Sequence, residues 1–145
     1  MSRLNYSRIL LGGLVAGVVF NAWEYVLNLV VMRQQWQSAM SDLGRNYPTS
    51  GQPLVLWVGW AFLAGILVTW LYALARARFG PGVRTAAIAG ATAWCLDCLL
   101  IAIAFANLGL LPAGMITILT AAALPEHVLA AIAGAWVYRE EANTP

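Results

Sequence analysis

Hydrophobic residues fill four long stretches of the chain, and polar residues gather between them. The stretches cover residues 9–32, 54–75, 85–106 and 113–138. Each is long enough to cross a bilayer as a helix, which takes about 20 apolar residues. The sequence therefore predicts an all-α fold, an integral membrane four-helix bundle that forms a single membrane domain over residues 1–145.

The first stretch begins like a secretory signal peptide, because Arg3 and Arg8 precede an apolar run. The apolar region of a signal peptide is about 7–15 residues long. Here the run continues past Glu24 to Met32. We interpret it as a membrane helix that the protein keeps.

The long first loop, residues 33–53, carries a second helical pattern. Apolar residues recur at helical spacing from Trp36 to Leu43, and Gly44 then offers a C-terminal cap. The pattern predicts a short helix at the outer membrane interface or a continuation of the first span. Aromatic residues in and near this loop are interpreted as interfacial anchors: Trp36, Tyr47, Trp57 and Trp60.

The composition agrees with a membrane protein. Of the 145 residues, 61% are hydrophobic and 10% are charged, whereas soluble domains have about 45–50% and 25%. The net charge of +2 is small and dispersed, so no nucleic-acid partner is predicted. Cys95 and Cys98 lie inside an apolar stretch, which argues against a disulfide framework.

The arginines predict the orientation in the membrane. With four spans, both termini and the second loop share one side, and that side carries most of the positive charge. It holds Arg3, Arg8, Arg76, Arg78, Arg84 and Arg139, whereas Arg33 and Arg45 fall on the other side. Cytoplasmic flanks carry the excess of Lys and Arg, so we expect both termini in the cytoplasm and the protein in the bacterial inner membrane.

Three of the six acidic residues, Glu24, Asp97 and Glu126, fall inside the predicted spans. A charge at the bilayer centre costs about 2.5–3.5 kcal/mol on insertion scales. With a rise of 1.5 Å per residue, all three are expected about 20–22 Å from the cytoplasmic ends of their helices. The sequence therefore predicts that three carboxyl groups share one layer of the bundle.

Small and polar residues predict which way the first acid faces. Gly13, Gly17, Asn21, Glu24 and Asn28 form one stripe of a helix, with small residues in one half and polar residues in the other. We expect this stripe to face the bundle. The predicted ligand- or proton-binding site, which includes no catalytic residue, comprises Asn21, Glu24, Asn28, Asp97, Glu126 and His127.

Pro125 directly precedes Glu126 and His127 in the fourth stretch. A proline inside a helix lacks the N–H that would bond the carbonyl four residues earlier, here that of Ala121. We therefore expect the Ala121 carbonyl to lack its helical hydrogen bond and to lie near the carboxyl group of Glu126 and the imidazole of His127. Such a set of groups is suited to binding a polar ligand.

The function predicted from this pocket is the binding or movement of a small cationic or polar solute, coupled to protonation. Burial disfavours the charged form of a carboxyl group, so such a group can exchange a proton for a cation. A chain this small would dimerise to enclose a pathway. In carrying a glutamate in its first helix it resembles the small multidrug-resistance exporters, with which it shares no motif.

Other functions stay open. The polar groups can serve as hydrogen-bonded contacts between helices, although such bonds contribute only about 0.6 kcal/mol each. The chain can be an accessory subunit of a larger membrane complex. An enzyme acting on a lipid or quinone is a further alternative, but no pairing of nucleophile and base and no nucleotide motif supports it.

A metal centre is the remaining alternative, and the residues identify no other cofactor. The metal-ligand candidates are Glu24, Asp97, Glu126 and His127. The Glu-x-x-His pairs of bundle di-metal proteins are missing. Cys95 and Cys98 have the spacing of half a metal or redox motif, and we interpret them as packing residues.

Three segments carry a resemblance to a family. They are WLYALARARFGPGVRTAAIAGATAW (70–94), LLGGLVAG (10–17) and AIAGAWVYRE (131–140). The chain resembles a family of small uncharacterised bacterial proteins with four membrane helices, a WLYA…RFGPG…TA core and a glutamate in the first span. Where many relatives have a proline in the turn, this chain has Ala77. The resemblance implies the fold and the location but no activity.

Overall fold

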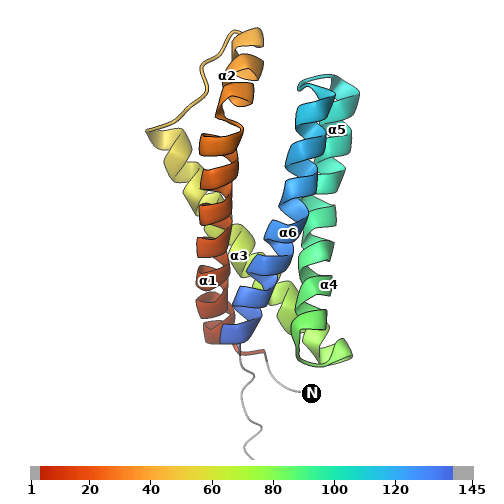
Figure 1. Ribbon diagram of the computed structural model, residues 1–145. Coiled ribbons are helices and arrows are strands. Elements are labelled where there is room, and N and C mark those ends of the chain that lie inside the picture. The colour runs from red at the N-terminus through yellow and green to blue at the C-terminus, as the bar shows by residue number, and fades with distance from the viewer. Residues whose placement is uncertain (1–3, 139–145) are drawn as a thin grey trace, which may run out of the picture.

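The computed structural model describes residues 4–138, so Arg3, Arg139 and Glu140 lie outside the described residues. Every regular element within residues 4–138 is helical. Figure 1 shows the order along the chain. The elements are α1 (Tyr6–Glu24), η1 (Tyr25–Val31), α2 (Arg33–Asp42), α3 (Gln52–Phe79), α4 (Val83–Trp94), η2 (Cys95–Leu99), α5 (Leu100–Leu108) and α6 (Ala113–Val137).

Four continuous helical rods are long and apolar enough to cross a membrane. Across the described residues these are Tyr6–Val31, Gln52–Phe79, Val83–Leu108 and Ala113–Val137. The first rod joins α1 to η1, and the third joins α4, η2 and α5. The predicted all-α fold with four membrane-length helices is confirmed. The location of α2 at a membrane interface and the cytoplasmic position of the termini stay predictions.

The helix ends follow from local sequence. Asn5 accepts a hydrogen bond from the backbone N–H of Arg8 at 3.0 Å, which caps the start of α1. Gly80, with a φ of 80°, ends α3, because a residue without Cβ adopts this conformation at little cost. The start of α1, the turn between α3 and α4, and the end of α6 all lie at one end of the bundle (Figure 1).

Glycines allow α1 and α3 to touch along their backbones. A Cβ added to Gly13 would lie 2.6 Å from the Cα of Ile66, and one added to Gly65 would collide with the backbone of Gly13 and Gly17. Such close approach is typical of membrane helices, where small residues allow extensive van der Waals contact. Gly13 and Gly17, the two glycines of the predicted stripe in the first span, therefore pack against α3.

The pattern of buried residues in α1 recurs in α4. In α1 the positions Gly12, Gly13, Ala16 and Gly17 are buried, and in α4 the same spacing gives Thr85, Ala86, Ala89 and Gly90. Seven residues after the last glycine of each set stands an acid, Glu24 in the first rod and Asp97 in the third. The two acids therefore occupy equivalent positions along their rods.

The second and fourth rods repeat in the same way. Buried residues with one spacing are Ala61, Gly65, Val68 and Tyr72 in α3, and His127, Ala131, Gly134 and Tyr138 in α6 and at its C-cap. The rings of Tyr72 and Tyr138 meet edge to face, 6.0 Å apart. The bundle thus consists of two similar helix pairs, residues 6–79 and 83–138, whose second helices meet at these tyrosines.

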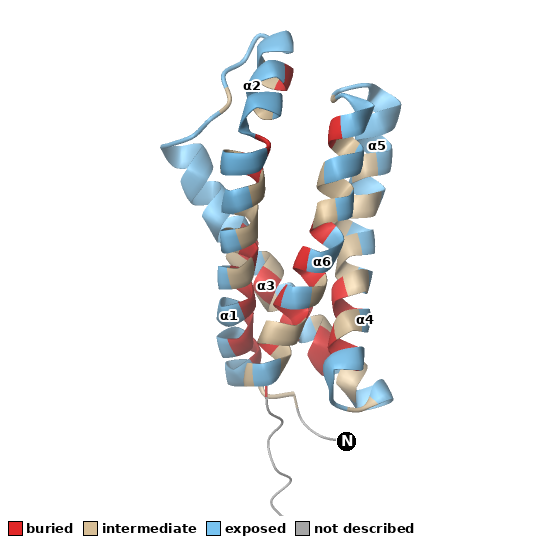
Figure 2. Cartoon of the chain, viewed as in Figure 1, coloured by how far each residue is buried: buried red, intermediate tan, exposed pale blue. Residues whose placement is uncertain are grey.

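The two pairs pack tightly at one end and separate toward the other. Most buried residues lie in the half of the bundle near the α3–α4 turn (Figure 2). Toward the other end, α1, η1 and α2 diverge from α5 and α6 in the view of Figure 1. A small apolar cluster of Met32, Ala39 and Met115 joins the two pairs there. The space between the two packed regions is where the acids lie.

Candidate functional site

Each of the three acids lies at an irregularity of its helix. The π-helical segment η1 begins directly after Glu24, and the π-helical segment η2 contains Asp97. Pro125 lies inside α6, directly before Glu126. π-Helical turns are rare and are frequent at functional sites. The coincidence of acids and irregular backbone favours a binding role over simple packing.

A cleft of about 220 Å³, which we call the central cleft, lies between the two helix pairs. Glu24, Asn28 and Trp57 line it from the first pair, and Asp97 and Cys98 line it from the second. Much of the remaining wall is aromatic or aliphatic, and includes Trp36, Trp60, Ile101, Phe105, Leu119 and Ala123. Two carboxyl groups from different helix pairs therefore face one apolar space.

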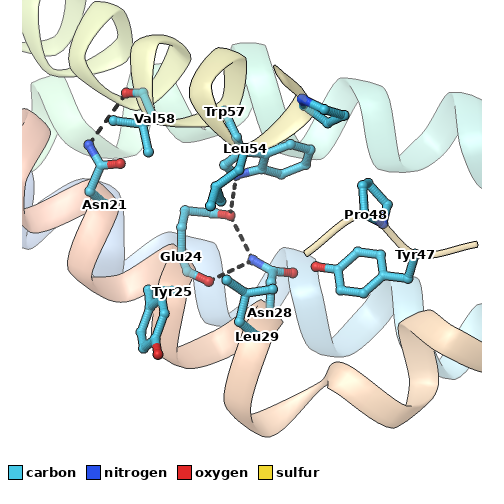
Figure 3. Close-up of a pocket in the computed structure, with 11 residues that line it drawn as sticks. Asn21, Glu24, Tyr25, Asn28, Leu29, Tyr47, Pro48, Leu54, Trp57 and Val58 are labelled. Atoms are coloured by element: carbon cyan, nitrogen blue, oxygen red, sulfur yellow. Dashed lines mark hydrogen bonds between the residues drawn. The ribbon is translucent and has the colours of Figure 1, made fainter. Parts of the chain in front are cut away.

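Glu24 is held by two side-chain donors. Its Oε2 accepts hydrogen bonds from Asn28 Nδ2 at 2.6 Å and from Trp57 Nε1 at 3.1 Å, and both are drawn in Figure 3. Trp36 Nε1 in turn donates to Asn28 Oδ1 at 2.7 Å. This chain of bonds joins α1, η1, α2 and α3 and fixes the direction of the carboxyl group.

A second cavity of about 300 Å³, the outer cavity, is also lined by Glu24. Asn21, Tyr47 and Leu54 line it (Figure 3). Glu24, Asn28 and Trp57 border both this cavity and the central cleft. Burial raises the pKa of Tyr47, and the nearby carboxyl group of Glu24 adds to the rise. The hydrogen-bonded group around Glu24 therefore borders two cavities.

Asp97 and His127 form the second polar group. Asp97 Oδ2 lies 3.1 Å from His127 Nε2, and His127 Nδ1 lies 2.7 Å from the carbonyl oxygen of Ala123. The ring of His127 is 1% exposed and meets the ring of Phe20 edge to face. The imidazole is thus held between α1, η2 and its own helix.

Glu126 is 1% exposed, and neither carboxyl oxygen has a hydrogen-bond partner within the described part of the chain. It interacts electrostatically with Glu24 and Asp97. An unpaired buried carboxyl group is costly, because burial without a hydrogen bond costs a polar group about 1–3 kcal/mol in proteins. Glu126 therefore adds a negative charge to the group of three acids when it is ionised, or a proton when it is protonated.

The structure distributes the predicted site residues over three places. Glu24, Asn28 and Asp97 line the central cleft, and His127 joins them through Asp97. Glu126 is buried beside this group. Asn21 instead donates to the carbonyl oxygen of Gly17 at 2.8 Å and lines the outer cavity rather than the central cleft.

Sequence reasoning missed two donors and one thiol. Trp36 and Trp57, interpreted as interfacial anchors, donate to Asn28 and Glu24. Cys98, interpreted as a packing residue, lies with Asp97 and His127 in a group whose ligand atoms are within 4.8 Å of one another. Trp36 lies eight residues after Asn28, a spacing that hints at its contact, whereas the pairing of Trp57 with Glu24 requires the tertiary fold.

Comparison with protein-family models, curated proteins and solved structures gives no match to this chain. The resemblance carried by residues 10–17, 70–94 and 131–140 thus stays a prediction. With four helices that are long and apolar enough to cross a membrane, the chain has the features of a multi-pass membrane protein.

Proposed function

We propose that this protein binds a small organic cation in the central cleft and moves it across the bacterial inner membrane in exchange for a proton held by Glu24. One observation carries the proposal: carboxyl groups from both helix pairs, Glu24 and Asp97, face a single space with aromatic walls.

The electrostatics favour a positively charged ligand. Glu24, Asp97 and Glu126 interact electrostatically, and among residues 4–138 no lysine or arginine lines the central cleft. Two unit charges 4 Å apart attract by about 4 kcal/mol at an effective dielectric constant of 20. A cation between Glu24 and Asp97 would relieve the repulsion between the two carboxylates and gain this attraction.

The aromatic walls favour an organic cation over a hydrated ion. Trp36, Trp57, Trp60 and Phe105 line the same cleft as the acids. The face of an aromatic ring attracts a cation by about 0.5–2 kcal/mol, depending on desolvation, and quaternary ammonium ligands are recognised in this way. A tetraalkylammonium ion combines a positive charge with an apolar surface, which matches this lining.

Glu24 is the residue proposed to exchange the proton. It borders both the central cleft and the outer cavity, so a group that reaches it from either side meets the same carboxyl. Asn28 and Trp57 donate to one carboxyl oxygen, which leaves the other for a proton or a ligand. A cation and a proton cannot bind this oxygen at the same time. Binding of the cation therefore requires release of the proton.

The predicted orientation assigns each end of the bundle to one side of the membrane. Because the arginine excess predicts cytoplasmic termini, the outer cavity and the loop that contains Tyr47 would face the periplasm. The end at which the helix pairs pack tightly would face the cytoplasm. Transport would then require the tightly packed half to open, within one chain or in a dimer.

Flux into liposomes tests the proposal. Purified protein is reconstituted with a pH-sensitive dye inside the vesicles, a pH gradient is set, and radiolabelled tetraethylammonium is added. We expect uptake coupled to proton movement by the parent protein and by Asp42→Asn, an exposed acid outside the cleft. Glu24→Gln should abolish the coupled flux. Equal flux through Glu24→Gln would overturn the proposal.

A further inference from the structure

We infer that Asp97, Cys98 and His127 form a binding site for one transition-metal ion of the zinc type, in the wall of the central cleft. The inference shares Asp97 with the proposed site for the organic cation but also requires Cys98 and His127, neither of which the proposed function uses as a ligand. One oxygen of Asp97, the Sγ of Cys98 and one ring nitrogen of His127 all lie within 4.8 Å of one another.

The hydrogen bonds of His127 show why a cation belongs at this place. A carbonyl oxygen only accepts, so His127 Nδ1 carries a proton that it donates to the oxygen of Ala123 at 2.7 Å. In the neutral ring, Nε2 then holds a lone pair. This nitrogen lies 3.1 Å from Asp97 Oδ2. A lone pair and a carboxylate oxygen repel each other unless a proton or a metal ion lies between them.

The orientation of the imidazole is that of a metal ligand. Histidines that bind metals almost always donate the second ring N–H to a carbonyl or carboxylate, which fixes the tautomer and the ring direction. The bond from Nδ1 to Ala123 does this for His127. The ring is also held by Phe20, whose centroid lies 4.8 Å away. His127 Nε2 therefore needs no rearrangement to bind an ion.

The donor set selects the class of metal. A thiolate, an imidazole and a carboxylate together suit Zn²⁺, which binds sulfur at about 2.3 Å and nitrogen or oxygen at about 2.0–2.2 Å. These bond lengths place tetrahedral donors about 3.3–3.6 Å apart. The separation of Asp97 and His127, 3.1 Å, is close to this value. The Sγ of Cys98 lies within 4.8 Å of both ligand atoms and would have to move closer to them to complete the triad.

Glu126 provides an independent reason for a positive charge. Its carboxyl group is 1% exposed, has no hydrogen-bond partner among residues 4–138, and interacts electrostatically with both Asp97 and Cys98. Asp97 Oδ1 is likewise buried without a hydrogen-bond partner in the described part of the chain. A divalent ion beside His127 would offset these groups together. Asp97 and Cys98 also line the central cleft, so a fourth ligand such as water can reach the ion.

Cobalt substitution tests the site, because Co²⁺ bound to a thiolate gives a charge-transfer band in the near ultraviolet as well as visible bands. The protein is purified in detergent, treated with a chelator and titrated with Co²⁺ alone. Cys95→Ser is the matched control, since Cys95 is an exposed free cysteine three residues before Cys98.

We expect one Co²⁺ per chain, a thiolate band in the parent protein and in Cys95→Ser, and loss of that band in Cys98→Ser. Competition with Zn²⁺ should show at least a tenfold weaker affinity in Cys98→Ser and in Asp97→Asn. Circular dichroism confirms that each variant keeps its helices. The absence of a thiolate band in the parent, or its persistence in Cys98→Ser, would overturn the inference.

Discussion

Glu24 and Asp97 occupy equivalent positions in the two helix pairs, and both line the central cleft. Each follows a buried glycine, Gly17 or Gly90, by seven residues. These glycines contact the second helix of their own pair: a Cβ on Gly17 would meet Phe62, and one on Gly90 would meet the backbone of His127. The same packing geometry thus presents one acid from each side of the cleft.

The first prediction concerns the glycine contact between α1 and α3. Alanine at Gly65 would force a Cβ into the backbone of Gly13 and Gly17, whereas a Cβ on Gly59 in the same helix meets nothing within 4 Å. Overpacking costs about 1–3 kcal/mol, and Gly→Ala in a helix returns only about 0.5–1 kcal/mol. Gly65→Ala should therefore lower the melting temperature in detergent, and Gly59→Ala should leave it unchanged or raise it. Equal melting temperatures would show that α1 and α3 do not approach this closely.

The second prediction concerns the donor that holds Glu24. Trp57→Phe removes the bond from Nε1 to the carboxyl group and keeps most of the ring. A typical hydrogen bond contributes about 0.5–1.5 kcal/mol, so thermal unfolding should begin at a lower temperature. Trp136→Phe is the control, because Trp136 is 76% exposed and should tolerate the change. If both variants melted alike, Trp57 would not hold Glu24.

The third prediction separates charge from hydrogen bonding at His127. Asp97→Asn keeps a side chain that can donate to His127 Nε2, whereas Asp97→Leu leaves this buried nitrogen without a partner. An unsatisfied buried group costs about 1–3 kcal/mol. Asp97→Leu should therefore unfold at a lower temperature than Asp97→Asn. A leucine variant as stable as the asparagine variant would contradict the bond.

The fourth prediction tests the orientation. Single cysteines at Ser50 and Pro81, both exposed, are introduced into a chain in which Cys95 and Cys98 are serine. In intact spheroplasts, a membrane-impermeant maleimide should label the Ser50→Cys variant and spare the Pro81→Cys variant until the membrane is broken. The reverse pattern would place the termini in the periplasm.

Hydrophobic length was sufficient to predict the four membrane-length helices, because each apolar stretch exceeds the thickness of a bilayer. The stripe from Gly13 to Asn28 also predicted correctly that small residues pack and that Asn28 is buried. The π-helical segments η1 and η2 were not predictable from the spacing of residues, because such a short change of helical period has no characteristic residue pattern.

The partners within the site depended on the tertiary fold. Glu24 and Trp57 lie 33 residues apart in the chain, and Asp97 and His127 lie 30 residues apart. The helix rise predicted similar depths for the three acids. It could not predict which of their side chains line the central cleft. The repeat between the helix pairs is visible in burial rather than in residue identity, because Gly12, Gly13 and Ala16 correspond to Thr85, Ala86 and Ala89.

The most direct measurement is calorimetric binding of tetraethylammonium to the purified protein in detergent. We expect saturable binding by the parent protein and by Asp42→Asn. Glu24→Gln should bind at least tenfold more weakly, a loss of about 1.4 kcal/mol, with unchanged helix content. Equal affinity in Glu24→Gln and the parent would contradict the claim that Glu24 and Asp97 form one cation site.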